Sequence, residues 1–219
     1  MKFAVLLAGS GVFDGSEIYE TTLTLLNLDR ADIDYQCMAP DIPQAHVINH
    51  MTGEEMPGES RNVLIEAARV ARGEIIDLAE ANPADYDALI VPGGFGVAKN
   101  LCDFAFKGDA MQINPSVKTF IQAVHKAGKP VGLICIAPTM AAQLFGEGTA
   151  CTIGTNEDVA AAIGKMGGKH ISCPVTDVVV DETKKLITTP AYMEAGRIRE
   201  AADGIEKLVA QLIDMDRPA

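Results

Sequence analysis

The sequence is poor in basic residues for its length. Its 219 residues include 18 Lys and Arg against 30 Asp and Glu, which gives a formal net charge of −12. Binding to a nucleic acid requires clustered Lys and Arg that neutralise the phosphate backbone. The shortage of such residues therefore argues against nucleic acid as a partner, while acidity by itself points to no other partner.

Long hydrophobic runs are also missing. No window reaches the roughly 18 apolar residues of a membrane span, so no membrane association is expected. The first residues, "MKFAVLLAGSG", hold a short apolar run after Lys2. They lack the full-length apolar region and small-residue cleavage site of a signal peptide. A buried first strand explains this run better.

Paired cysteine motifs are absent too. The sequence has no CxxC pair, and its number of cysteines is odd. The five are Cys37, Cys102, Cys135, Cys151 and Cys173. Free thiols of this kind are typical of a reducing compartment, so a cytoplasmic location is expected.

What the sequence does contain is a regular alternation of strand-like and helical patterns. The strand-like runs occupy 2–8, 33–39, 87–92, 131–136 and two stretches within 176–189. The helical patterns occupy 17–28, 61–73, 116–128, 137–145 and 198–212. This rhythm predicts an α/β three-layer sandwich, with a mainly parallel sheet and helices on both faces. One domain over residues 1–219 is expected, with the polar stretch 41–59 as a candidate insertion.

One cysteine stands where a buried strand meets a helix. In "GLICIAPTM", residues 132–140, an apolar run ends at Cys135, and Pro138 lies early in the helical pattern that follows. A cysteine at a helix N-terminus can be held as a thiolate and act as a nucleophile. Free cysteine is also among the most buried residue types, and packing explains Cys135 equally simply.

Two other turns fall at the same end of the predicted sheet. Gly9 and Gly11 begin a GxGxxG pattern, but Asp14 occupies its third glycine position and would repel a pyrophosphate, so dinucleotide binding is disfavoured. Glu17 is either a helix cap or a catalytic acid. The turn at 92–96, "PGGFG", could expose backbone N–H groups as an oxyanion hole, or serve packing alone.

Together these blocks resemble one known family, the ElbB proteins of the class I glutamine amidotransferase-like superfamily, which also includes the PfpI and ThiJ proteins. The resemblance is carried by "SGVFDGSEIYE", "INHMTGE", "ALIVPGGFGVAKNL", "GKPVGLICIAP" and "ITTPAYM", in this order. It implies a flavodoxin-like sandwich with Cys135 on a nucleophile elbow and Glu17 facing it. Oxyanion donors are implied at the Gly94 and Ile136 N–H groups, beside Gly93.

The resemblance also implies an activity. ElbB-like proteins are cofactor-free glyoxalases that convert glyoxal, a small dicarbonyl, to glycolate, and a homodimer is expected. In this mechanism the Cys135 thiolate forms a hemithioacetal, and Glu17 relays a proton between the two carbons. Two alternatives stay open: a redox-sensing or binding module with vestigial catalysis, and an ammonia-generating amidotransferase subunit.

The sequence departs from the wider superfamily at the expected histidine. PfpI-type peptidases have a histidine directly after the cysteine, where this chain has Ile136. If the 41–59 insertion forms a lid, Asn49 or His50 would approach Cys135 and replace that histidine. The other interpretation is a surface hairpin that packs against a partner subunit. His46 and His50 have metal-ligand spacing, but the segment lacks a helical pattern, so no metal is expected.

The thiol and the acid have linked protonation states. A helix entrance favours the Cys135 thiolate, whereas a charged Glu17 disfavours it by repulsion. We therefore expect a raised pKa for Glu17, a lowered pKa for Cys135, and titration of the two as a coupled pair.

Overall fold

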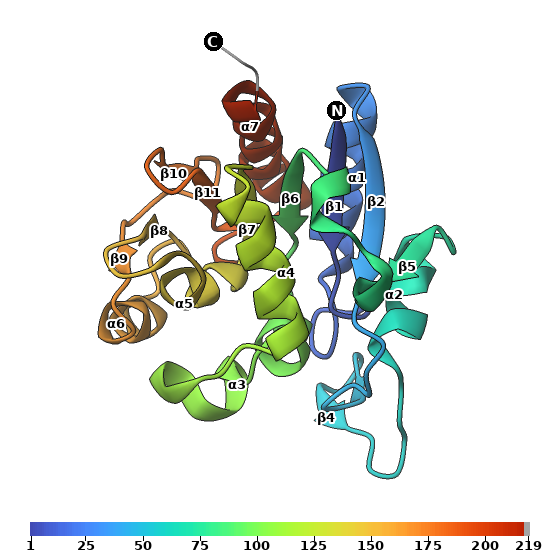
Figure 1. Cartoon of the computed structure of the whole chain (residues 1–219). Helices are drawn as coiled ribbons and strands as arrows, with labels where there is room; N and C mark the ends of the chain where they lie inside the picture. The colour runs from blue at the N-terminus through green and yellow to red at the C-terminus, as the bar shows by residue number, and fades with distance from the viewer. Residues whose placement is uncertain (217–219) are drawn as a thin grey trace.

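The computed structural model describes residues 1–216, and its centre is a seven-stranded sheet (Figure 1). The strands are β1 (Lys2–Leu6), β2 (Asp34–Ala39), β5 (Ile75–Asp77), β6 (Ala88–Val91), β7 (Val131–Ile134), β10 (Val179–Asp181) and β11 (Leu186–Thr189). Their order across the sheet is β10-β11-β7-β6-β1-β2-β5. All neighbours pair in parallel except β10 and β11, which form the antiparallel edge.

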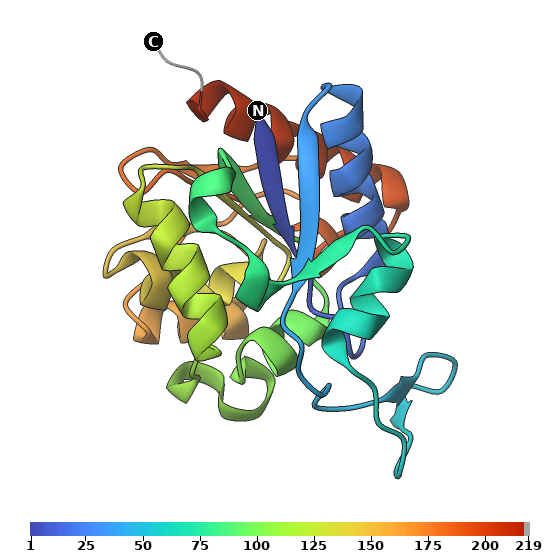
Figure 2. The same cartoon turned by 45° about the vertical axis from the view of Figure 1, so that its right-hand side comes forward.

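Helices cover both faces of this sheet, as the alternating sequence pattern predicts. They are α1 (Ile18–Arg30), α2 (Val63–Val70), α3 (Phe104–Lys107), α4 (Pro115–Lys126), α5 (Ala141–Phe145), α6 (Glu157–Lys165) and α7 (Ile198–Asp216). On one face α1 packs against α7 and α2, while α4 packs against β6 and α5 on the other (Figure 2). The three-layer α/β sandwich is thus confirmed. Among residues 1–216, no helix is long and apolar enough to cross a membrane.

The central strands are buried on both faces because their residues are almost continuously apolar. Every residue of β6 and β7 is buried, and β1 is buried from Phe3 onward. Gly132 lets α7 pack closely on β7, since a Cβ there would lie 2.9 Å from the side chains of Leu208 and Leu212 and would push them aside. The strands thus carry the core, and their register brings the following loops to a common edge.

That edge is the carboxyl end of the parallel strands. From β1 the chain goes to β2 on one side, whereas β6 and β7 lie on the other side. Ligands of open α/β sheets bind at such a switch point, beyond the strand ends. The loops after β1, β6, β7 and β11 meet there.

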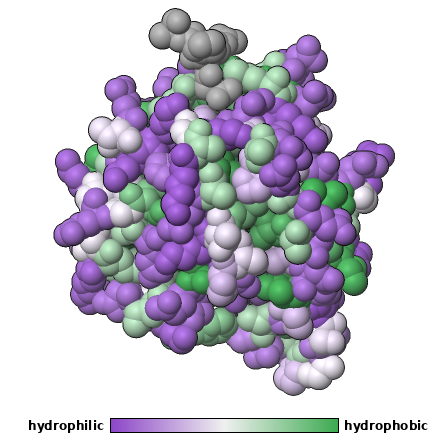
Figure 3. All heavy atoms as spheres, viewed as in Figure 1, coloured by the Kyte–Doolittle hydropathy of each residue, from purple (hydrophilic) through white to green (hydrophobic). Residues whose placement is uncertain are grey.

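The 41–59 segment forms a surface hairpin, and the packing of this hairpin against a partner subunit stays a prediction. It contains the short strands β3 (Ile48–Asn49) and β4 (Glu54–Glu55) and extends away from the sheet (Figure 2). A second small pair, β8 (Ala150–Cys151) and β9 (Lys169–His170), lies beside β10 and β11. Figure 3 shows a mostly hydrophilic face, with hydrophobic side chains gathered over β5 and α2, where Ile65 is largely exposed.

Candidate active site

Cys135 occupies a strained turn directly after β7. Its φ of +63° lies in the left-handed region that residues with a side chain rarely adopt. The Cys135 N–H still donates to the Thr189 carbonyl at 2.9 Å, and a short 3₁₀ turn, Ala137–Met140, then leads into α5. Strain of this kind is typical of functional positions. The strand-to-helix turn predicted from the sequence is confirmed.

Two backbone N–H groups converge on the sulfur. Those of Gly94 and Ile136 hydrogen-bond to Cys135, and both interactions lower the pKa of the thiol. Gly94 has a φ of +98° and packs directly on the Gly15–Glu17 backbone, so glycine is needed for both conformation and packing. The packing interpretation of the glycine turn is therefore confirmed, and the oxyanion hole stays a prediction.

Gly93 contacts a carboxylate, whereas Gly94 contacts the thiol. The Gly93 N–H donates to the Glu20 carboxylate Oε2 at 2.8 Å. A Cβ at Gly93 would collide with the Cβ of Cys135 and lie 2.6 Å from that same oxygen. Gly93 therefore allows the thiol and a carboxyl group to approach each other.

Glu20 is the acid in contact with Cys135, and the sequence analysis did not single it out. Its side chain is fully buried and hydrogen-bonds to the Cys135 side chain. Its other oxygen, Oε1, accepts from the Tyr192 N–H at 3.0 Å. Burial, helped by the charge of Glu17, raises the pKa of Glu20 to about 7 against the hydrogen bonds that lower it.

The thiol of Cys135 is correspondingly hard to ionise. Burial raises its pKa well above the ordinary value, and the nearby Glu20 carboxylate raises it further. The Gly94 and Ile136 N–H groups lower it, but by less. The expectation of a lowered pKa for Cys135 is wrong, because burial outweighs the N–H dipoles, and the acid that couples to the thiol is Glu20 rather than Glu17.

Glu17 lies at the N-terminus of α1 and has two roles open to it. Its Oε2 accepts the Glu20 N–H at 2.7 Å, so it is the N-cap of the helix. It also lines the same cavity as Cys135, and burial raises its pKa, as predicted. Capping and proton transfer are compatible, because only one carboxylate oxygen is used by the cap.

The cavity at Cys135 has a volume of about 290 Å³. Its walls are largely apolar, with Val12, Phe95, Ala98, Phe104, Val159 and Met193 among the lining residues. Tyr192 and Asn156 bring polar groups to the same cavity. Glu17, Gly94, Cys135 and Ile136, four of the residues expected at the site, meet here.

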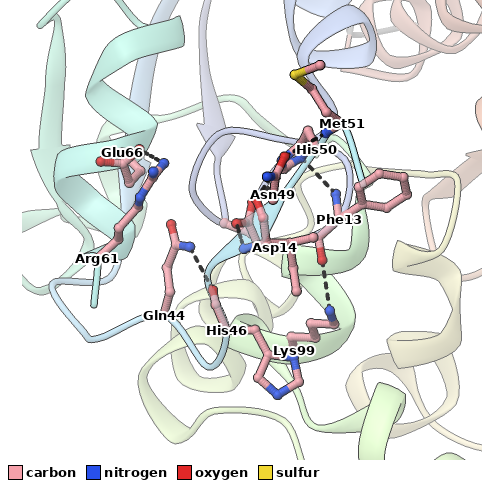
Figure 4. Close-up of polar contacts among 12 residues, drawn as sticks. Phe13, Asp14, Gln44, His46, Asn49, His50, Met51, Arg61, Glu66 and Lys99 are labelled. Atoms are coloured by element: carbon pink, nitrogen blue, oxygen red, sulfur yellow. Dashed lines mark hydrogen bonds and ion pairs between the residues drawn. The ribbon is translucent and has the colours of Figure 1, made fainter. Parts of the chain in front are cut away.

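The structure does not bring Asn49 or His50 to this cavity. His50 Nε2 accepts from the Phe13 N–H at 3.2 Å, and Nδ1 lies 3.1 Å from the Ile48 carbonyl (Figure 4). Asn49 accepts from Met51 within the hairpin. The hairpin is anchored by Asp14, whose buried carboxylate accepts from the Ile48 N–H at 2.8 Å.

None of the four histidines is among the described residues that line the cavity. Within residues 1–216, no three His, Cys, Asp or Glu side chains are grouped so that they could hold a metal ion. All five cysteines are free and buried. Among the described residues, the titratable groups of the site are thus two carboxyls, one thiol and the Tyr192 phenol.

A flavodoxin-like α/β sandwich with a cysteine on a strained turn after a central strand defines the class I glutamine amidotransferase-like fold. The model of the DJ-1/PfpI family matches residues 8–195, and the chain belongs to that family. The family expectation drawn from the sequence is confirmed at this level.

Known proteins resemble the chain over nearly its whole length. Human glutamine amidotransferase-like class 1 domain-containing protein 3, mitochondrial, is 42% identical over 98% of this chain and 83% of its own. An Ehrlichia chaffeensis isoprenoid biosynthesis protein with an amidotransferase-like domain is 36% identical, with a TM-score of 0.92 over 99% of this chain and 100% of its own. The glyoxalase III of Candida albicans shares the fold, with 13% identity and a TM-score of 0.60 over 96% and 97% of the two chains.

The raised pKa of Glu20 predicts a pH-dependent stability. From pH 4.5 to about 7 the unfolded chain releases this proton while the native protein keeps it, so rising pH disfavours the fold. Relative to Glu20→Gln, the wild type should lose about 3 kcal/mol of unfolding free energy between pH 4.5 and pH 8. Urea unfolding at several pH values measures this difference. Glu206→Gln, on the exposed side of α7, is the control and should keep the pH dependence of the wild type. A Glu20→Gln protein that also keeps the wild-type pH dependence would contradict the assignment.

Glu20 should also suppress the reactivity of Cys135. Removing its charge in Glu20→Gln lowers the pKa of the thiol, so alkylation by iodoacetamide at pH 7.5 should become about tenfold faster. Peptide mass spectrometry identifies the labelled cysteine and its rate. Labelling of Cys135 at an equal or slower rate in the variant would show that Glu20 does not control this thiol.

Proposed function

We propose that the chain is a cofactor-free glyoxalase of the ElbB type, which converts glyoxal or a similar small dicarbonyl to a 2-hydroxy acid. The observation that carries the proposal is the position of Cys135. A thiol, two backbone N–H donors and two carboxyls with raised pKa values meet at one end of the sheet. These are the parts that thiol addition to an aldehyde and a subsequent proton transfer require.

In the first step the Cys135 thiol adds to one aldehyde carbon. Glu20 accepts the thiol proton as the S–C bond forms, because its carboxylate already holds that proton in a hydrogen bond. The oxygen that becomes negative lies near the sulfur, where the Gly94 and Ile136 N–H groups are directed. Protonation of this oxygen gives a hemithioacetal, and a pKa near 7 lets Glu20 return the proton.

The second step moves a proton between the adjacent carbons. Glu17 lines the cavity, whereas Glu20 is fully buried behind the sulfur and both of its oxygens accept backbone N–H groups. We therefore assign the relay to Glu17, which takes the C–H proton of the hemithioacetal to give an enediol and delivers it to the neighbouring carbon. The hydroxyl proton of the hemithioacetal passes to the oxygen of the second aldehyde, which becomes the alcohol of the product. The product is a thioester of Cys135, and water hydrolyses it to the hydroxy acid and the free thiol.

Relatives support this proposal at two levels. The glyoxalase III of Candida albicans shares the fold. The Ehrlichia chaffeensis relative is described as an isoprenoid biosynthesis protein. This description is in line with the resemblance of the sequence to the ElbB proteins, which are also called enhancing lycopene biosynthesis proteins.

The first test of the proposal is steady-state conversion of glyoxal by the purified protein. Wild-type protein should form glycolate at least about 100-fold faster than Cys135→Ala, because the variant has no nucleophile. Product is measured by NMR or by an enzymatic glycolate assay, to separate conversion from simple loss of glyoxal. Equal rates in the two proteins would overturn the enzyme proposal.

Glu17→Gln separates the relay from the cap. The amide oxygen of Gln can still accept the Glu20 N–H, so α1 keeps its N-cap and the melting temperature should change little. The amide neither accepts nor releases a proton near neutral pH, so kcat should fall about 100- to 10,000-fold. A variant with kcat within a factor of two of the wild type would remove Glu17 from the mechanism.

A further inference from the structure

A second cavity adjoins the one at Cys135. Its volume is about 420 Å³, and it lies between the 41–59 hairpin and the loops around Phe13, Phe95 and Phe106. Phe95 and Ala105 line both cavities, so the two share a wall. The Phe95 and Phe106 side chains are each about half exposed. A ligand that passes Phe95 would therefore contact both cavities.

A π-helix after the glycine turn divides its side chains between the two cavities. Val97–Leu101 adopts this rare conformation, which is frequent at functional sites. Its Ala98 lines the cavity at Cys135, and the next residue, Lys99, lines the second one. Close to Lys99, the ring of His46 packs edge-on against Phe106, with 5.3 Å between the ring centroids.

Lys99 is a cation without a close counter-ion. Its ammonium donates to the neutral Phe13 carbonyl at 2.8 Å and lies 5.6 Å from the Phe95 ring centroid (Figure 4). No carboxylate within residues 1–216 lies within the 4.0 Å of an ion pair with it. Asp14 and Glu55 act on it from farther away, and half-burial lowers its pKa.

The shape and polarity of the first cavity also fit more than a two-carbon dialdehyde. Glyoxal would contact Cys135 and the backbone donors, and would leave the apolar wall of Val12, Phe104 and Met193 without a partner. An alkyl chain on the substrate would cover this wall and favour binding by burial of apolar surface. The far end of such a chain would emerge past Phe95 toward Lys99.

We propose that the two cavities form one extended site for a 2-oxoaldehyde with an apolar chain and a terminal carboxylate, and that Lys99 binds the carboxylate. The inference rests on the proposed function for the reaction at Cys135. The assignment of a carboxylate to Lys99 rests on charge complementarity. The chain has 30 acidic residues, yet the half-buried ammonium of Lys99, which faces the second cavity, has no carboxylate as an ion-pair partner within residues 1–216.

The kinetic test compares ω-carboxy-2-oxoaldehydes with their methyl esters, which have nearly the same shape but no charge. In the wild type, kcat/KM should be about tenfold higher for the acid at the best chain length. Lys99→Met should bring this ratio to about one, and Lys99→Arg should keep most of it. Lys126→Met removes one exposed charge from α4 and should leave the ratio unchanged. No preference in the wild type, or an unchanged ratio in Lys99→Met, overturns the proposal.

A binding test is independent of turnover. Calorimetry should show that the wild type binds octanoate about tenfold more tightly than octanamide, and that Lys99→Met binds the two equally. If this difference holds while no dicarbonyl is converted, the glyoxalase proposal fails and the carboxylate subsite stands. If octanoate and octanamide bind the wild type equally, or neither binds, the subsite is overturned even where glyoxal is converted.

Discussion

The hydrogen bond between the side chains of Cys135 and Glu20 is the interaction on which this site depends. Glu20 comes from α1, the thiol from the end of β7, and the N–H groups that hold the carboxyl from the loops after β6 and β11. Removing any one of these partners would leave a buried polar group unsatisfied. The bond therefore fixes the relative positions of four chain segments, and glycine at position 93 follows from it.

The same bond determines the chemistry that is available. A thiol beside a buried carboxylate keeps its proton, whereas a carboxyl with a pKa of about 7 can accept that proton and return it near neutral pH. The site is thus suited to a reaction in which the thiol loses its proton to Glu20 only as its sulfur adds to a bound electrophile. The backbone donors of Gly94 and Ile136 then act where negative charge develops rather than on a resting thiolate.

The sequence predicts six of the seven strands of the sheet, the position of Cys135 and the need for glycines after β6, because these depend on local patterns. It misses the edge strand β5, whose three residues are too few to show a strand pattern. The role of Glu20 is not predicted from the sequence, because an acidic residue inside a helical pattern is ordinarily exposed. A signal was present, however: Glu20, Thr24 and Leu28 lie at four-residue intervals, and all three are buried on one stripe of α1. The helix α6 is absent from the sequence-based expectation because Ile163 is its one fully buried residue, which leaves little apolar periodicity.

The position of the 41–59 hairpin could not be derived from its sequence. Its direction is set by tertiary contacts, chiefly the Asp14 carboxylate on the Ile48 N–H and the Asn100 side chain on the Ala45 N–H. These contacts link residues distant in the chain and turn the hairpin toward Lys99 and Phe106 rather than Cys135. The 41–59 segment therefore does face a cavity, but it is the cavity at Lys99 and not the cavity at Cys135 that the lid hypothesis requires.

The most direct measurement of the thiol–acid pair is a carbon-13 NMR titration of the Glu20 carboxyl, assigned by its loss in Glu20→Gln. The structure predicts a midpoint near pH 7 in the wild type. It also predicts a higher midpoint in Cys135→Ala, because the thiol hydrogen bond that favours the carboxylate is then lost. A midpoint near 4.5 that does not move in Cys135→Ala would contradict a buried pair that shares a proton.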